Sequence, residues 1–282
     1  MPYEFFNIEK SDGVAKVTIN RPPSNAMSVE FIDELGTVLA ELEDDNEVRA
    51  VLFRSGLPKY FMTGADLKTI PPNVDLSDID PNLPPIEVMK KTIPRLIDFI
   101  IPIFQAAQGV MNQIESLPKP TVVLISGHAL GGGLELCLAC DFRIMARGSA
   151  TIGLTEVNLG LLPSAGGTQR LTRLLGRGKA IELILLGKRL NADEAEAAGL
   201  IYKAVDPELL EEEGEKLASE LAQRATLSMA KAKQCIYGGE DLPLEKGLEM
   251  ERECLKDLMK SEDVVEGVVS FTVGKKPEFK GR

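Results

Sequence analysis

The sequence predicts an α/β fold over residues 1–205 and a helical C-terminal region over residues 206–282. In the first part, apolar segments rich in β-branched residues alternate with loops and helical segments, the order typical of α/β domains. From residue 206 on, every segment has a helical pattern and none has that of a strand. Hydrophobic residues make up 44% of the chain and charged residues 27%, a mixture typical of folded globular proteins.

Short apolar runs predict the strands of the first part. They cover residues 14–19, 49–53, 121–125 and 141–146, with another short strand near residue 151. Residues 70–86 differ, because five prolines lie among acidic residues there. We therefore expect a loop or excursion from the core over this segment.

Capping residues and prolines delimit the predicted helices. Ser28 is expected to cap the first helix, and Asn191-Ala192-Asp193-Glu194 has the pattern of a capping box. An apolar helical stretch over residues 86–116 should break or kink at Pro94 and Pro102. Further helices are predicted from the glycines at 131–133, from about residue 167, and over residues 207–224, 228–237, 244–260 and 261–271.

Charge and composition disfavour several classes of protein. Lys and Arg number 32 against 43 Asp and Glu, so the net charge of −11 disfavours nucleic-acid binding. Cys137 and Cys140 lack a second pair, and His128 is the only histidine, so we expect packing roles for all three and no metal site. The most apolar stretch, residues 96–104, is shorter than the roughly 20 residues of a membrane helix. We expect a cytoplasmic protein.

A strand, a glycine-rich turn and a helix follow one another over Ser126–Glu135. The glycines 131–133 leave backbone N–H groups free at the positive end of a helix, which suits an anion or a developing oxyanion. The alternative is a tight turn with close packing of strand and helix. A second polar turn over Phe61–Lys68 also follows a strand. Two such turns could supply two N–H donors to one carbonyl oxygen.

Two glutamates lie beside apolar residues. Glu135 stands between two leucines just inside the glycine-headed helix, and Glu156 follows the apolar segment 152–154. An apolar environment raises the pKa of a carboxyl group toward neutrality, which suits proton transfer. For each glutamate alone, the alternative is a solvated or salt-bridged side chain.

Six stretches in order resemble the crotonase superfamily, specifically enoyl-CoA hydratase. They are Asn20-Arg21-Pro22-Pro23-Ser24-Asn25-Ala26, Phe61–Lys68, Gly127–Asp141, Gly153–Val157, Gly160–Leu171 and Glu266–Phe279. The resemblance implies a spiral of β-β-α turns in residues 1–205. It also implies that the helical region 206–282 builds trimers, often paired into hexamers, and completes the site. The implied substrate is an acyl-CoA thioester, and CoA enters as part of that substrate, so no separate cofactor is expected.

The resemblance also implies roles for individual residues. The oxyanion hole falls on the backbone N–H groups of Ala65 and Gly132, and the hydratase glutamates fall on Glu135 and Glu156. For Lys68, an ordinary solvated lysine is an equal alternative. The implied CoA- and substrate-binding positions are Thr63, Gly64, Asp66, Leu67, Lys68, Gly131, Pro163, Ser164, Phe271 and Lys275.

Some positions depart from the family pattern. The segment 69–105 is longer than usual and borders the acyl pocket in the family, which leaves the acyl preference open. Thr155 stands where proline is usual, Ser164 where glycine is usual, and Gly274 where a lysine is usual.

The favoured function is hydration of a trans-2-enoyl-CoA to a 3-hydroxyacyl-CoA by syn addition of water, in fatty-acid or aromatic-acid breakdown. Retention of both glutamates is the main reason. The alternatives are isomerisation, or hydration of a cyclic or branched acyl-CoA. A non-catalytic RNA-binding homologue is remote, because it would need a lysine-rich exposed helix. No nucleic-acid or membrane partner is expected, and the partner subunits are copies of the chain.

Overall fold

Two sheets carry the first part of the chain, and a computed structural model describes them within residues 2–66, 77–80 and 82–281. The larger sheet has the order β1-β2-β3-β5-β7-β9. Its strands are β1 (Phe6–Ser11), β2 (Val14–Ile19), β3 (Ala50–Ser55), β5 (Thr121–Ile125), β7 (Phe142–Ala146) and β9 (Lys203–Val205). Only β1 runs antiparallel to its neighbour, as the first arm of a hairpin with β2.

A second, smaller sheet has three parallel strands in the order β4-β6-β8. These strands are β4 (Tyr60–Met62), β6 (His128–Leu130) and β8 (Ile152–Gly153). Each follows a strand of the larger sheet, so the chain passes from one sheet to the other in the pairs β3–β4, β5–β6 and β7–β8. Helices separate successive pairs. This arrangement confirms the predicted spiral of β-β-α turns.

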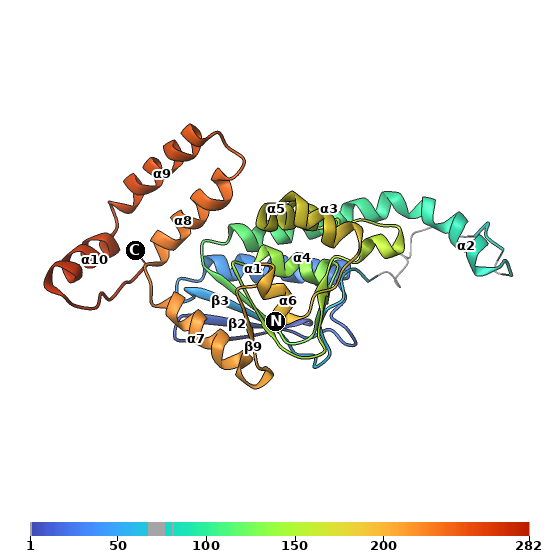
Figure 1. The fold of residues 1–282 in the computed structure, drawn as a ribbon, viewed down its shortest axis with the longest axis horizontal. Coiled ribbons are helices and arrows are strands. Elements are labelled where there is room, and N and C mark those ends of the chain that lie inside the picture. The colour runs from blue at the N-terminus through green and yellow to red at the C-terminus, as the bar shows by residue number, and fades with distance from the viewer. Residues whose placement is uncertain (1, 67–76, 81, 282) are drawn as a thin grey trace.

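The helices of the spiral cover both faces of the larger sheet, except for the second helix, which projects away from it (Figure 1). They are α1 (Val29–Asp44), α2 (Pro85–Thr92), α3 (Ile97–Ser116), α4 (Gly132–Ala139), α5 (Gly167–Leu185), α6 (Ala192–Ala197) and α7 (Leu210–Ala222). The main core lies between the sheets and α1, α3 and α4, and a second core lies between the larger sheet and α7. At Gly214 a Cβ would lie 2.4 Å from Leu124, so glycine allows α7 to lie directly on β5.

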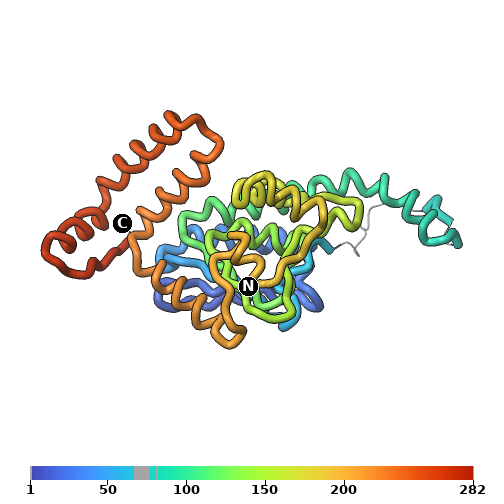
Figure 2. Tube along the Cα trace, in the orientation of Figure 1, coloured from blue at the N-terminus to red at the C-terminus, as the bar shows by residue number. Residues whose placement is uncertain are grey.

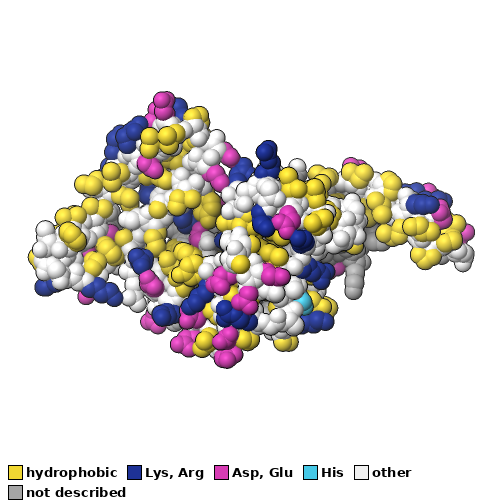
Figure 3. Space-filling view, in the orientation of Figure 1, with side chains coloured by type: hydrophobic (Ala, Val, Ile, Leu, Met, Phe, Trp, Pro, Cys, Tyr) yellow, Lys and Arg dark blue, Asp and Glu magenta, His cyan; other side chains and the backbone are white. Residues whose placement is uncertain are grey.

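The C-terminal helices extend away from the spiral at one end, and α2 projects at the other (Figure 2). The C-terminal helices are α8 (Thr226–Gly239), α9 (Leu244–Leu258) and α10 (Glu262–Val273). Asp141, at the start of β7, anchors α8: its carboxylate accepts hydrogen bonds from Lys233 Nζ at 2.7 Å and Tyr237 Oη at 2.8 Å. Hydrophobic side chains gather on these helices and along the α2–α3 projection in the space-filling view (Figure 3).

Several predicted element boundaries are confirmed. Ser28 Oγ accepts a hydrogen bond from Phe31 N, and the capping box at Asn191 is present. At Pro94 the predicted break is a 3₁₀ turn (Ile93–Leu96) between α2 and α3. The expected break or kink at Pro102 is not a break, because α3 continues through Pro102 to Ser116. The described part of segment 70–86 is irregular until α2 begins.

Four short or exposed strands were not predicted. β1 is largely exposed and polar, so it has no continuous apolar run. β4, β6 and β9 have three residues each, which is too short for an alternating pattern to appear. Two of these, β4 and β6, belong to the smaller sheet.

Candidate active site

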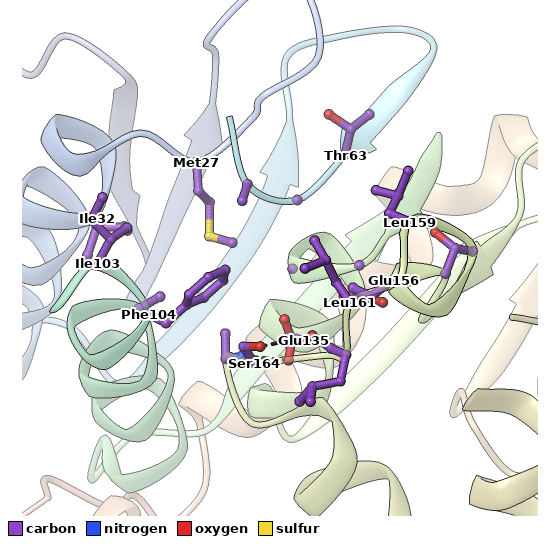
Figure 4. A pocket seen from close by; sticks show the side chains of 18 residues that line it. Met27, Ile32, Thr63, Ile103, Phe104, Glu135, Glu156, Leu159, Leu161 and Ser164 are labelled. Atoms are coloured by element: carbon purple, nitrogen blue, oxygen red, sulfur yellow. Dashed lines mark hydrogen bonds between the residues drawn. The ribbon is translucent and has the colours of Figure 1, made fainter. Parts of the chain in front are cut away.

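The three strands of the smaller sheet end beside one cavity of about 130 Å³ (Figure 4). Parallel strands bring their carboxyl ends to the same edge of a sheet, where ligands commonly bind. β4 is followed by residues 63–65, β6 by Gly131 and Gly132, and β8 by Thr155 and Glu156, and all of these line the cavity. Three segments far apart in sequence therefore meet at one site.

The rest of the cavity wall is largely apolar. Figure 4 shows Phe104 of α3 on one side, Leu159 and Leu161 with Glu156 on the other, and Glu135 between them. The remaining lining residues are Met27, Ile32, Ile103, Ala107, Ser164 and Ala165. The cavity can therefore hold an apolar group against a small number of polar groups.

Glycines at the start of α4 allow the segments to approach closely. Gly131 has φ of 55°, and a Cβ there would lie 2.9 Å from Glu156 Oε1. At Gly133 a Cβ would lie 2.2 Å from the Met62 carbonyl oxygen. Close packing of strand and helix, the alternative interpretation of this turn, is therefore correct for Gly133. Gly131, in contrast, leaves room for the carboxylate of Glu156.

Ala65 and Gly132 line the cavity at the junction of the two turns. Gly64 has φ of 90°, and a Cβ there would lie 3.0 Å from Gly132 N, so the turns are in contact. Met27 N donates a hydrogen bond to Gly64 O, and Met27 O accepts one from Asp66 N. Ala65 N takes no part in this pairing. As the first residue of α4, Gly132 has no intrahelical acceptor. Within the described ranges, neither amide donates a hydrogen bond.

Glu135 is buried in the first turn of α4, with 2% of its surface exposed. Its Oε1 accepts hydrogen bonds from Ala165 N at 2.8 Å and from Gly167 N at 2.7 Å. Gly167 must be glycine, because a Cβ there would lie 2.9 Å from Glu135 Oε1. The turn at residues 165–167 therefore clamps one carboxylate oxygen.

Burial raises the pKa of Glu135 from 4.5 to about 7. The two backbone N–H groups oppose this shift, and the negative charge of Glu156 adds to it. A carboxyl group with a pKa near 7 can take or give a proton at neutral pH.

Glu156 begins a 3₁₀ turn (Glu156–Leu159) and is half-buried at the cavity. Burial also raises its pKa. Its Oε2 is buried and has no hydrogen-bond partner in the described part of the chain. Buried polar atoms are rarely left unpaired, so this oxygen is available to a bound water or substrate.

The structure brings together most of the predicted site residues. Glu135, Glu156, Ala65, Gly132, Thr63, Gly64, Gly131 and Ser164 all line the cavity. Pro163 is buried just behind Ser164, and Asp66 bonds to Arg21 at 2.9 Å, so neither lines it. Leu67 and Lys68 lie outside the described residues.

Two predicted residues lie away from the cavity. Phe271, on α10, is 87% exposed, and Lys275 follows the end of that helix. Neither lines the cavity of its own chain. His128 packs as predicted: its ring lies against Tyr60, and its Nδ1 accepts a hydrogen bond from Thr151 N at 3.0 Å.

Sequence reasoning missed the clamp on Glu135 and the apolar wall. Ala165 and Gly167 act through backbone N–H groups, so only the adjacent glycines 166 and 167 could have signalled the clamp. Phe104 lies in the apolar stretch predicted as a helix, but its direction depends on how α3 packs. In the part of the chain that the structure describes, no group of three His, Cys, Asp or Glu side chains could hold a metal ion. Over the same residues, no helix is long and apolar enough to cross a membrane.

The fold and these residues define a crotonase. The sequence pattern of the enoyl-CoA hydratase/isomerase family matches residues 9–79 and 103–282, and the chain belongs to this family. The match leaves out residues 80–102, so the extra length predicted between the motifs falls on α2 and the start of α3.

Individual relatives carry hydratase names. The chain is 34% identical to the short-chain-enoyl-CoA hydratase of Clostridium acetobutylicum, over 98% of this chain and 97% of that one. It is 36% identical to human enoyl-CoA hydratase domain-containing protein 2, mitochondrial, over 96% of this chain and 86% of that one. A crystal structure of enoyl-CoA hydratase from Bacillus anthracis is similar with a TM-score of 0.85 and 33% identity, covering 99% and 100% of the two chains.

Proposed function

We propose that this chain hydrates trans-2-enoyl-CoA thioesters to 3-hydroxyacyl-CoA by syn addition of water. The observation that carries the proposal is the meeting of two glutamates with raised pKa values and two undonated backbone N–H groups at one apolar cavity. Membership of the enoyl-CoA hydratase/isomerase family supports the same reaction.

The N–H groups of Ala65 and Gly132 are proposed to bind the thioester oxygen. When water attacks the β-carbon, electrons move onto that oxygen and form an enolate-like anion. Both donors then stabilise charge that is larger in the transition state than in the substrate. Loss of one such donor typically costs about 2.7–4 kcal/mol of transition-state stabilisation.

The two glutamates are proposed to divide the proton transfers. Glu135 Oε1 already accepts two N–H groups, which favours the carboxylate form, so Glu135 is the base that takes a proton from water. Glu156 has an unpartnered buried oxygen and gives a proton to the α-carbon as the enolate collapses. The new C–O and C–H bonds add one water to the double bond. After the step Glu135 holds one more proton and Glu156 one fewer, so one proton returns from Glu135 to Glu156 before the next turnover. Their titration belongs to the pair.

The cavity supports an apolar acyl group. Phe104 and Ile103 of α3 face leucines of the segment 159–162, and a charged acyl group would lose its hydration there without a partner. Isomerisation is the second reaction of this family, and we rank it below hydration because both glutamates face the cavity. The preference for straight, cyclic or branched acyl groups is a separate proposal for substrate profiling.

We further propose that α8–α10 assemble the chain into trimers or hexamers. Exposed apolar side chains on α9 and α10, including Leu244, Met259, Val265 and Phe271, support this. In such an assembly Phe271 and Lys275 would reach a neighbouring copy's CoA. A role in fatty-acid metabolism and a cytoplasmic location remain predictions.

The test is the loss of the conjugated-thioester absorbance of crotonyl-CoA. The wild type should hydrate it, and Glu135→Gln and Glu156→Gln should each lower kcat by a factor of about 10²–10⁴. Isomerase activity on a 3-enoyl-CoA, measured in parallel, tests the second reaction. A folded wild type that binds CoA but leaves crotonyl-CoA unchanged would contradict short-chain hydration.

A further inference from the structure

Arg170 lies directly beneath the turn that clamps Glu135. It belongs to the first turn of α5, and its Nη1 donates a hydrogen bond to the Ala165 carbonyl at 3.3 Å. The same peptide segment donates its Ala165 and Gly167 N–H groups to Glu135 Oε1. The guanidinium and the carboxylate therefore hold opposite sides of one short turn.

The turn is shaped around the guanidinium. Gly166 has φ of 108°, and a Cβ there would lie only 2.1 Å from Arg170 Nη1. Any other residue at position 166 would displace the arginine and strain the backbone. The glycine is thus required by both the conformation of the turn and the place of the guanidinium.

Helix α3 fixes the other side of the guanidinium. Arg170 Nε and Nη2 donate to the two carboxylate oxygens of Glu115 at 3.0 and 3.1 Å, and Nη2 also donates to Asn112 Oδ1 at 2.7 Å. The arginine side chain is only 10% exposed, so this paired contact is better shielded than a surface ion pair. Arg170 therefore joins the helix that carries Phe104 to the turn that holds Glu135.

We infer that Arg170 is a positioning residue for Glu135, acting through the turn at residues 165–167 and not by contact with substrate. The inference rests on the proposed function only where the test measures kcat, because kcat requires that the chain hydrates crotonyl-CoA. Arg170 is not among the residues that line the cavity, whereas its acceptor Ala165 is. A guanidinium held on two sides keeps both N–H donors aimed at the carboxylate, and proton transfer depends steeply on such geometry.

The charges around Glu135 determine the direction in which its pKa should move when one of them is removed. Glu156 raises the pKa of Glu135, and Arg170 lowers it. Glu115 neutralises Arg170 from α3. Other charged or titratable groups on the packed strands are engaged elsewhere: His128 of β6 bonds Thr151, and Arg143 of β7 bonds carbonyls at the C-terminal end of α4.

Two variants should shift the pKa of Glu135 in opposite directions. Arg170→Met removes the positive charge, so the acidic limb of the kcat profile, where the base must ionise, should move to higher pH. Glu115→Gln keeps an acceptor for the arginine but removes a negative charge, so that limb should move to lower pH. A residue that merely supports the fold would not produce opposite shifts.

The plateau of kcat tests the positioning itself. On the plateau, compared at each variant's own pH optimum, Glu135 is ionised and Glu156 protonated in every variant, so lost alignment alone should lower kcat in Arg170→Met by about 10- to 100-fold with little change in KM. Arg170→Lys keeps the charge but cannot bond Ala165, Asn112 and Glu115 together, so it should keep the limb and lose part of kcat. Arg173→Met, on the same helix and paired with Asp241 at the surface, is the matched control and should behave as wild type.

A readout without turnover separates this inference from the proposed function. In pH-difference infrared spectra, the Glu135 carboxyl band is the one that Glu135→Gln removes. Its midpoint should rise in Arg170→Met and fall in Glu115→Gln even if crotonyl-CoA is not a substrate. Unchanged plateau kcat in folded Arg170→Met, or midpoints that move in the same direction, would overturn the inference. If Arg170→Met does not fold, an unchanged plateau kcat in Arg170→Lys, or a midpoint that does not fall in Glu115→Gln, would overturn the inference.

Discussion

Replacing Glu135 by glutamine should slow hydration by a factor of about 10²–10⁴ and at the same time stabilise the folded chain at alkaline pH. The carboxyl group has a pKa of about 7 in the fold, against 4.5 for an ordinary glutamate. One pKa unit corresponds to about 1.4 kcal/mol. Ionisation of this buried group therefore lowers the free energy of unfolding by about 3 kcal/mol once the pH exceeds 7.

The sign of this effect follows from which state holds the proton. Below pH 4.5 Glu135 is protonated in both the folded and the unfolded chain, and the stabilising preference for the proton is fully present. Between pH 4.5 and 7 the unfolded chain loses its proton first, so stability falls as the pH rises. In Glu135→Gln the new side chain would keep an acceptor oxygen for the Ala165 and Gly167 N–H groups and would never ionise.

Urea-induced unfolding at one protein concentration measures the difference. The free energy of unfolding of Glu135→Gln should exceed that of wild type by about 1 kcal/mol or less at pH 5 and by about 3 kcal/mol at pH 8. Glu245→Gln, at an exposed position of α9, is the control and should show no such trend. A difference between Glu135→Gln and wild type that does not change with pH would refute the reasoning.

Three further substitutions test other parts of the site and fold. Gly64→Ala places a methyl group 3.0 Å from Gly132 N and should lower kcat on crotonyl-CoA by about 10²–10³, whereas Gly178→Ala, where a Cβ meets nothing within 4 Å, should leave kcat unchanged. Phe104→Ala enlarges the apolar wall and should raise kcat/KM for octenoyl-CoA relative to crotonyl-CoA, by up to about fourfold per added methylene, and an unchanged ratio would remove Phe104 from the acyl site. Asp141→Ala leaves Lys233, whose side chain is only 12% exposed, without its carboxylate and should lower the free energy of unfolding by about 3 kcal/mol, with faster proteolysis of α8–α10 as the local readout.

The sequence predicted the elements whose burial gives a long enough signal. β3, β5 and β7 are buried over most of their length, and each was expected within one residue or so of its observed start. Ser28 and Asn191 marked helix starts because side-chain caps are local. β1 escaped because an exposed edge strand has no apolar face to detect.

The two glutamates at the cavity were predictable and the groups that support them were not. Glu135 and Glu156 stand out as carboxylates among apolar residues, and the glycines at 131–133 stand out by composition. The clamp on Glu135 uses backbone N–H groups 30 and 32 residues away, and a backbone donor has no residue type of its own. Arg170 lies inside the matched stretch Gly160–Leu171, but its contact with the turn at residues 165–167 was not predicted, since an arginine on a helix is ordinarily a solvated side chain.

The smaller sheet explains why the order of the motifs indicated residues that line this cavity although two of the three strands, β4 and β6, were not predicted. Its strands have two or three residues, so they carry almost no sequence signal, yet each one ends at a segment that lines the cavity. Such short strands cannot be stable alone, so the larger sheet must align them through the paired connections β3–β4, β5–β6 and β7–β8. The number of residues between a long strand and the next glycine or glutamate therefore determines whether that residue reaches the cavity. That spacing is a property of the motifs, which is why their order was the stronger predictor.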